Sequence, residues 1–210
     1  ALPADAQSRR ATAVEAPASL TPRATPAAQR AVTFAAAPGQ PSGALILPLG
    51  AEADLAARGA SLSPAVREAV AAALSAARFD YKARQTLSLH GVGGWDRILI
   101  LGLPTDAKAA EVQTAGIVAG RVLIAQPGEM TVLTAGLSAD SVAELATGLG
   151  LGQYRSDLHR TTGRDVAAPG GITLVADDAS GAQAAWRRGS ALVEAMAWTR
   201  DISNEPANVI

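Results

Sequence analysis

Few side chains in this sequence have the types and spacing that catalysis or metal binding requires. The two histidines, His90 and His159, are far apart, and neither has a second candidate ligand at a metal-binding spacing. A zinc site needs three or four converging His, Cys or carboxylate ligands, and the chain has no cysteine. Asp177 and Asp178 could hold a cation, but a strand that leads into a helix explains such an acidic pair at least as well. We therefore predict no catalytic, cofactor-binding or metal-binding residue in these 210 residues.

Two glycine-rich segments are the remaining candidates for a binding loop. Residues 90–94 read HGVGG between two predicted strands, and Gly148, Gly150 and Gly152 come after a predicted helix. Neither has the strand, G-x-G-x-x-G and helix order of a dinucleotide site, and there is no phosphate-binding lysine motif. Turn formation and helix termination account for both segments, although a loop after a strand can bind phosphate in an α/β sheet.

Composition narrows the functional classes. The 18 basic and 19 acidic residues nearly balance, which gives no electrostatic case for binding nucleic acid or a membrane surface. No apolar run approaches the roughly 20 residues that span a bilayer. The absence of cysteine excludes disulfides and thiolate metal sites without deciding the compartment.

The first 29 residues differ from the rest. Ten alanines and four prolines leave Leu2, Val14 and Leu20 as the larger apolar groups. Such a segment buries too little apolar surface to offset the entropy of ordering it. We predict a flexible Ala/Pro-rich arm over residues 1–29.

From residue 30 onward, short apolar runs alternate with segments of helical periodicity. The predicted strands are 31–36, 44–49, 86–90, 97–103, 131–135 and 172–177, and the predicted helices begin at Pro64 and cover about 107–125, 138–149 and 180–200. Strands that alternate with helices indicate an α/β fold with a mostly parallel sheet covered by helices on both faces. We expect this N-terminal domain to occupy residues 30–178.

The last predicted helix runs into an unusual C-terminal segment, residues 199–210, which read TRDISNEPANVI. Its expected inner face includes Trp186, Val193 and Met196, and Trp198 near its end should have something to pack against. Pro206 stops the helix. We expect residues 179–210 to form a linker helix and a junction to a further domain.

The residues of this junction are similar to those of a known family. Arg200, Asp201, Asn204, Pro206, Ala207 and Asn208 match, one by one, the segment that joins the two domains of the leucyl aminopeptidases, the M17 family. Tyr154 matches the first aromatic position of a family segment after a glycine-terminated helix, but Leu158 and His159 depart from that segment's later aromatic positions. The strand at 97–103 resembles one that ends in Gly-Leu-Gly, with Pro104 in place of the last glycine.

The resemblance implies a macro-domain-like, non-catalytic N-terminal portion of a cytoplasmic aminopeptidase. In the family, a second domain holds two divalent metal ions, zinc or manganese, which activate water and polarise the N-terminal peptide bond of a peptide substrate. The metal ligands and catalytic residues belong to that domain, so none is assigned to this chain. The resemblance further implies a homo-oligomer, a hexamer, in which this portion serves assembly and substrate access.

Two other functions share the predicted fold and stay open at this point. One is a stand-alone macro-like module that binds a nucleotide such as ADP-ribose through the glycine loops. The other is a purely structural assembly partner. Fold alone does not separate these possibilities.

Overall fold

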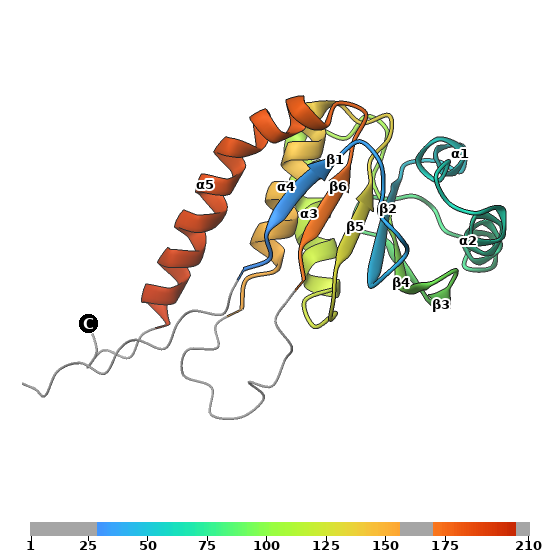
Figure 1. Ribbon diagram of the computed structural model, residues 1–210, viewed down its shortest axis with the longest axis horizontal. Coiled ribbons are helices and arrows are strands. Elements are labelled where there is room, and N and C mark those ends of the chain that lie inside the picture. Colours follow the sequence, from blue (N-terminus) through green and yellow to red (C-terminus); the bar gives the residue numbers. More distant parts are fainter. Residues whose placement is uncertain (1–28, 156–169, 205–210) are drawn as a thin grey trace, which may run out of the picture.

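A six-stranded sheet forms the centre of the computed structural model, which describes residues 29–155 and 170–204 (Figure 1). The strand order is β1-β6-β5-β2-β4-β3. Its strands are β1 (Val32–Ala35), β2 (Ala44–Leu49), β3 (Thr86–Val92), β4 (Trp95–Gly102), β5 (Met130–Leu133) and β6 (Ile172–Val175). All neighbouring pairs are parallel except β3 and β4, which are antiparallel. The predicted α/β class with a mostly parallel sheet is confirmed.

Helices cover both faces of the sheet (Figure 1). On one face lie α1 (Asp54–Arg58) and α2 (Pro64–Ala76), and on the other lie α3 (Ala109–Val122), α4 (Ala139–Gly152) and α5 (Ala179–Ser203). None of the helices among the described residues is long and apolar enough to cross a membrane.

The central strand β2 shows how the sequence builds two cores at once. All six of its residues are buried. Leu45 and Leu47 face the layer of α1 and α2, whereas Ile46 faces the layer of α3, α4 and α5. Because successive side chains of a strand point to opposite faces, a continuous apolar run is what a doubly covered parallel strand requires.

The glycines of α4 are packing residues, which corrects their interpretation as the end of a helix. The helix α4 continues to Gly152. A Cβ atom at Gly148 would lie 2.0 Å from the carbonyl oxygen of Gln113 in α3, and one at Gly116 would lie 2.3 Å from the carbonyl oxygen of Leu145. Glycine is therefore required on both helices, because α3 and α4 approach each other with their backbones nearly in contact.

The glycine-rich segment at 90–94 forms the tight turn of a β-hairpin. Val92 pairs with Trp95, and Gly93 and Gly94 between them have φ angles of +60° and +87°. Two residues with positive φ are what the favoured two-residue hairpin turn needs. The turn precedes β4, so it lies at the edge of the sheet where the parallel strands begin, away from their carboxyl ends.

Candidate functional site

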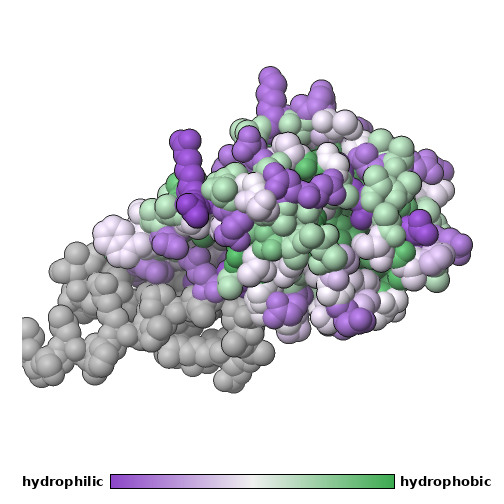
Figure 2. Space-filling view, turned by 45° about the horizontal axis from the view of Figure 1, so that its top comes forward, coloured by the Kyte–Doolittle hydropathy of each residue, from purple (hydrophilic) through white to green (hydrophobic). Residues whose placement is uncertain are grey.

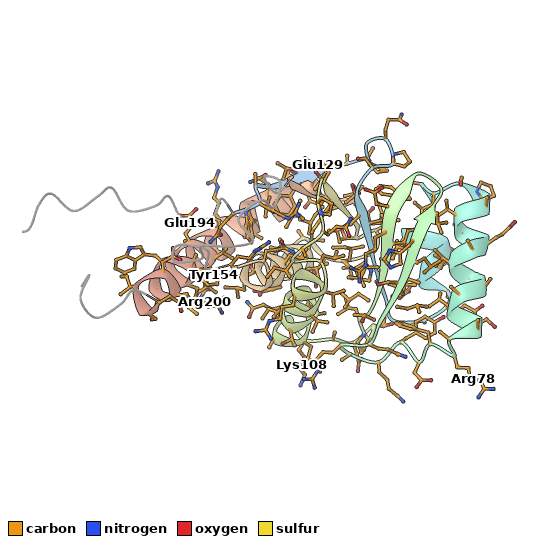
Figure 3. The ribbon with its side chains drawn as sticks, turned by 90° about the horizontal axis from the view of Figure 1, so that it is seen from below. Arg78, Lys108, Glu129, Tyr154, Glu194 and Arg200 are labelled. Carbon is orange, nitrogen blue, oxygen red and sulfur yellow. The ribbon has the colours of Figure 1, made fainter. Side chains whose placement is uncertain are left out.

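The described residues of the junction segment gather around one tyrosine. Arg200, Asp201 and Asn204 lie at the end of α5, and Tyr154 lies two residues after α4. Figure 3 labels Tyr154 and Arg200, which lie close together. The Tyr154 hydroxyl donates to Oδ1 of Asp201 at 2.8 Å and accepts from Nδ2 of Asn204 at 3.3 Å. The Arg200 guanidinium carbon stands 5.2 Å from the centre of the Tyr154 ring, within cation–π range. We call these four residues the junction cluster. Pro206, Ala207 and Asn208 lie outside the described residues.

The junction cluster also closes the end of α4. Arg200 donates from a guanidinium nitrogen to the carbonyl oxygen of Leu151 at 3.2 Å. The last carbonyls of a helix have no partner within the helix, and a cation is favourable at that end of the helix dipole. A side chain of α5 therefore satisfies the backbone of α4. The two helices are joined at their C-terminal ends by charge as well as by shape.

Arg30 forms a second anchor beside the junction cluster. Its side chain is 8% exposed, and its donors reach the carbonyl oxygens of three loop residues, namely Gln126, Gly128 at 2.5 Å and Gly170 at 3.0 Å. These loops lead into β5 and β6, and Arg30 itself precedes β1. Burial lowers the pKa of Arg30, and the nearby Glu129 carboxylate opposes that shift. One guanidinium thus ties together the starts of three neighbouring strands.

Gln153 connects this anchor to the helices. Its Oε1 accepts from Nε of Arg30 at 3.1 Å, and its Nε2 donates at 2.7 Å to the carbonyl oxygen of Gly120, in the last turn of α3. Tyr154 follows directly in the chain. The Arg30 anchor and the junction cluster consequently share one short connection after α4.

A groove of about 180 Å³ opens next to Arg30, between β1 and α5. Its walls combine apolar side chains with polar ones; they include Val32, Ile172, Trp186 and Val193, together with Gln153, Ser190 and Glu194. Arg30 lines the groove, but the hydrogen bonds described for it are donated to backbone carbonyls and to Gln153. Among the described residues that line the groove, no pair of side chains is arranged for acid–base or nucleophilic chemistry.

The carboxyl ends of the parallel strands, where sheets of this class usually bind ligands, are occupied by a different arginine. The strands β2 and β5 pair only from Ala44 to Ile46 on β2. Beyond that point, the 7%-exposed Arg58 donates to the carbonyl oxygen of Pro48 and, at 3.2 Å, to that of Ala135. Arg58 therefore bridges the end of β2 and the loop that follows β5.

Asp54 completes this arrangement. Its Oδ2 lies 3.3 Å from the Arg58 guanidinium and accepts from the backbone N–H groups of Gly50 at 2.7 Å and Ala51 at 3.2 Å. Burial lowers the pKa of Arg58, and Asp54 opposes the shift. Both members of the charge pair are hydrogen-bonded to the protein's own backbone.

Asp177 and Asp178, the acidic pair between the last strand and the last helix, also accept hydrogen bonds from the backbone. Asp178 is the N-cap of α5 and accepts from Gly181 N–H at 2.8 Å, while Asp177 accepts from Gly136 N–H at 2.9 Å. Hydrogen bonds from Gly181 and Ser180 lower the pKa of Asp178. His90 is exposed on β3, and His159 lies outside the described residues.

Within residues 29–155 and 170–204, no group of three or more His, Cys, Asp or Glu side chains could hold a metal ion. The side chains in these ranges therefore do not fit a dinuclear metal centre. What the arrangement does is mechanical, because its charged side chains fix loops and helix ends.

Comparison with known proteins places these observations in context. No family model matches the chain. It is 34% identical over 152 residues to a probable cytosol aminopeptidase of Dinoroseobacter shibae, covering 71% of this chain and 30% of the relative. It is 35% identical over 173 residues to one of Methylorubrum extorquens, covering 75% and 34%. The chain thus spans about a third of the length of these curated relatives.

Solved structures show the same fold. A mutant tomato leucine aminopeptidase matches with a TM-score of 0.65 and 20% identity, over 88% of this chain and 40% of that one. The bottromycin maturation enzyme BotP, also solved in complex with Mn, matches with a TM-score of 0.53 and 22% identity, over 81% of this chain and 33% of that one.

Proposed function

The chain belongs to the cytosol aminopeptidase family, M17, of whose members it spans about a third, and we propose that it is a non-catalytic N-terminal portion. Under this proposal the parent protein is a metal-dependent leucyl-type aminopeptidase that removes N-terminal residues from peptides. Residues 179–210 form the linker to the catalytic domain, which holds two divalent ions, zinc or manganese.

The junction cluster is the observation that carries the proposal. Tyr154 and the pair Arg200 and Asp201 were identified from two separate segments that resemble this family, nearly fifty positions apart. The side chains meet through the 2.8 Å hydrogen bond and the ring contact. A linker helix must keep a fixed orientation if it is to position a second domain. The contacts of the junction cluster restrain the orientation of α5 at its C-terminal end.

The role that follows for these residues is positioning. The strand anchor Arg30 and the junction cluster connect the C-terminal end of α5 to the starts of β1, β5 and β6. An attached domain would inherit this orientation, so the portion serves assembly and access of peptides to the catalytic centre. Homo-oligomer formation, as a hexamer, belongs to the same proposal.

The carboxyl edge favours this interpretation over a nucleotide-binding module. A phosphate would need free backbone N–H groups or a free cation near the ends of β2 and β5. There, Arg58 is engaged with two carbonyls, and Asp54 accepts the N–H groups of Gly50 and Ala51. Titration with ADP-ribose should give no heat signal by calorimetry; saturable binding would favour the module instead.

A leucine anilide assay tests the proposal directly. The 210-residue chain with added manganese should show no turnover, whereas the full polypeptide should hydrolyse the substrate, lose activity with a chelator and regain it with Mn²⁺ or Zn²⁺. Turnover by the isolated chain would contradict a non-catalytic role. A full polypeptide that stays inactive with every added metal would contradict the aminopeptidase assignment.

A further inference from the structure

The two halves of α5 differ in what they leave exposed. In the part of the chain that the structure describes, the exposed large hydrophobic side chains are Trp198 at 66% and Leu192 at 44%, and both lie in the distal half of α5. That half leans away from the sheet, so its end projects beyond the body of the domain (Figure 1). Elsewhere, the face drawn in Figure 2 interleaves hydrophilic with hydrophobic residues.

The exposed apolar residues form one stripe. Ala191, Ala195, Trp198 and Ile202 follow the spacing i, i+4, i+7 and i+11, and Leu192 lies beside them. At 3.6 residues per turn, these positions share one side of the helix. We call these five residues the distal stripe. Each is exposed except Ile202, which is half-buried.

The distal stripe lies opposite the face by which α5 already packs. Val193 and Ala197 are buried, and Val193 fits against Gly150 of α4. The helix end is thus apolar on two sides. Its first half is not, because exposed Arg187 and Arg188 flank Ala184 on the side that the stripe later occupies.

A tryptophan held in water on a helix with a second apolar face is typical of an interface residue. Trp is enriched among residues that dominate binding energy, and a contiguous apolar surface rimmed by polar groups marks interaction sites. Here the rim is supplied by the exposed residues Glu194 and Thr199. Glu194 is labelled on α5 in Figure 3.

We propose that the distal stripe docks onto the remainder of the parent polypeptide, with Trp198 as the central contact. This inference rests on the proposed function. Its occupant follows from length and attachment, since the chain spans only 30% and 34% of two relatives and α5 leads into the junction segment. A domain tethered a few residues beyond Ser203 is present at a high effective concentration, so a small apolar surface suffices to hold it.

Hydroxyl-radical footprinting of the full polypeptide tests the docking. Trp95 and Trp198 have the same intrinsic reactivity, but Trp95 is 3% exposed inside the domain core. If the stripe is covered, Trp198 should be oxidised at nearly the rate of Trp95. Oxidation of Trp198 roughly tenfold faster than Trp95 in folded protein would overturn the proposal, because the docked state would then be the minor one.

Matched variants locate the contact. Ala195→Glu places a charge within the stripe and should raise the oxidation of Trp198 severalfold, whereas Ala184→Glu, an exposed alanine on the same side of the first half, should leave it unchanged. Equal responses would overturn the proposal. The wild-type comparison of Trp198 with Trp95 stands without any variant, so a misfolded Ala195→Glu protein does not remove the test.

Two further results separate the alternatives. Protection of Trp198 that disappears on dilution, while Trp95 stays protected, would identify a second copy of the chain as the occupant and overturn the choice made here. Leucine anilide turnover is measured on the same samples. Protection of Trp198 in a polypeptide without turnover would support the docking while rejecting the aminopeptidase assignment.

Discussion

A buried arginine lies at each edge of the central sheet, where the parallel strands begin and where they end, and the two arginines have different roles. At the carboxyl edge, Arg58 links the end of β2 to the loop that follows β5, and its partner Asp54 lies only four residues away. At the amino edge, Arg30 reaches loops 98 and 140 residues away and connects through Gln153 to the junction cluster. The contacts of Arg58 stay within the carboxyl edge, whereas those of Arg30 connect the amino edge to the end of α5.

This difference shows how a fold can carry function away from its customary site. The carboxyl edge of a parallel sheet is where ligands usually bind, and here its charged groups hold backbone. The amino edge instead collects the ends of α3, α4 and α5. Under the proposed positioning role, rigidity where α5 ends matters more than an open crevice.

The largest expected effect comes from breaking the carboxyl edge. Arg58→Leu would leave the carbonyls of Pro48 and Ala135 and the Asp54 carboxylate without their cation. Removing one partner of a buried pair costs about 3 kcal/mol of unfolding free energy. Urea unfolding measures this loss. The exposed control Arg187→Ala should change stability by no more than about 0.5 kcal/mol, and a similar loss in both variants would refute the bridging role.

A smaller effect is expected where α3 and α4 meet at the amino edge. Gly152→Ala would put a Cβ atom 2.5 Å from the carbonyl oxygen of Ile117. The end of α4 must then shift, at about 2 kcal/mol of unfolding free energy. The shift should also loosen Tyr154, two residues on. Gly39→Ala, where a Cβ atom meets nothing within 4 Å, is the matched control.

The junction cluster should give a smaller and more local response. Tyr154→Phe keeps the ring under Arg200 but removes the hydroxyl that joins Asp201 and Asn204, a loss of about 1 kcal/mol. Hydrogen exchange should accelerate in the last turns of α5 while the central strands stay protected. Glu194→Gln, an exposed carboxylate on the same helix, should not accelerate it. Uniform acceleration across the sheet would argue against a local hold.

The smallest effect concerns the cap of α5 at the carboxyl edge, and it depends on pH. The pKa of Asp178 is lowered in the folded protein, so its stabilising contribution is present above the ordinary value of 3.8 and is lost as pH falls through the folded pKa. Asp178→Ala should therefore lower the melting temperature slightly at pH 7. The difference from wild type should shrink toward pH 2; a constant difference would exclude the ionised carboxylate as its cause.

Local patterns in the sequence were enough to predict most of the fold. The strand β2 agrees with its predicted range of 44–49, because a continuous apolar run between turn residues has few alternatives. The strand β3 was predicted at 86–90, but its antiparallel pairing with β4 was not, although Gly93-Gly94 between two strands is a hairpin signal. The five-residue α1 was missed because it is too short to show helical periodicity.

The site was less accessible to prediction from the sequence. Nothing in the sequence distinguishes Arg30 and Arg58 from other arginines, since a buried arginine is recognised only from carbonyls brought in by distant segments, such as those of Gly128 and Gly170. The four-residue spacing of Gly148 and Gly152, repeated by Gly116 and Gly120 in α3, did contain a signal for close helix packing. The junction residues were found through resemblance, and their meeting at Tyr154 required the structure.

Because α5 is long, contacts at its C-terminal end restrain its rotation more effectively than contacts near its start. Its 25 residues extend about 37 Å at 1.5 Å per residue. A rotation of about 5° at the N-terminal end of α5 would move its C-terminal end by roughly 3 Å, as simple geometry applied to that length requires. The hydrogen bonds of Tyr154 act at the C-terminal end of α5, farthest from the N-terminal end. A restraint placed there resists rotation of the helix most effectively, because its lever arm is longest. Under the proposed function, a few polar contacts there would steady the domain that follows α5.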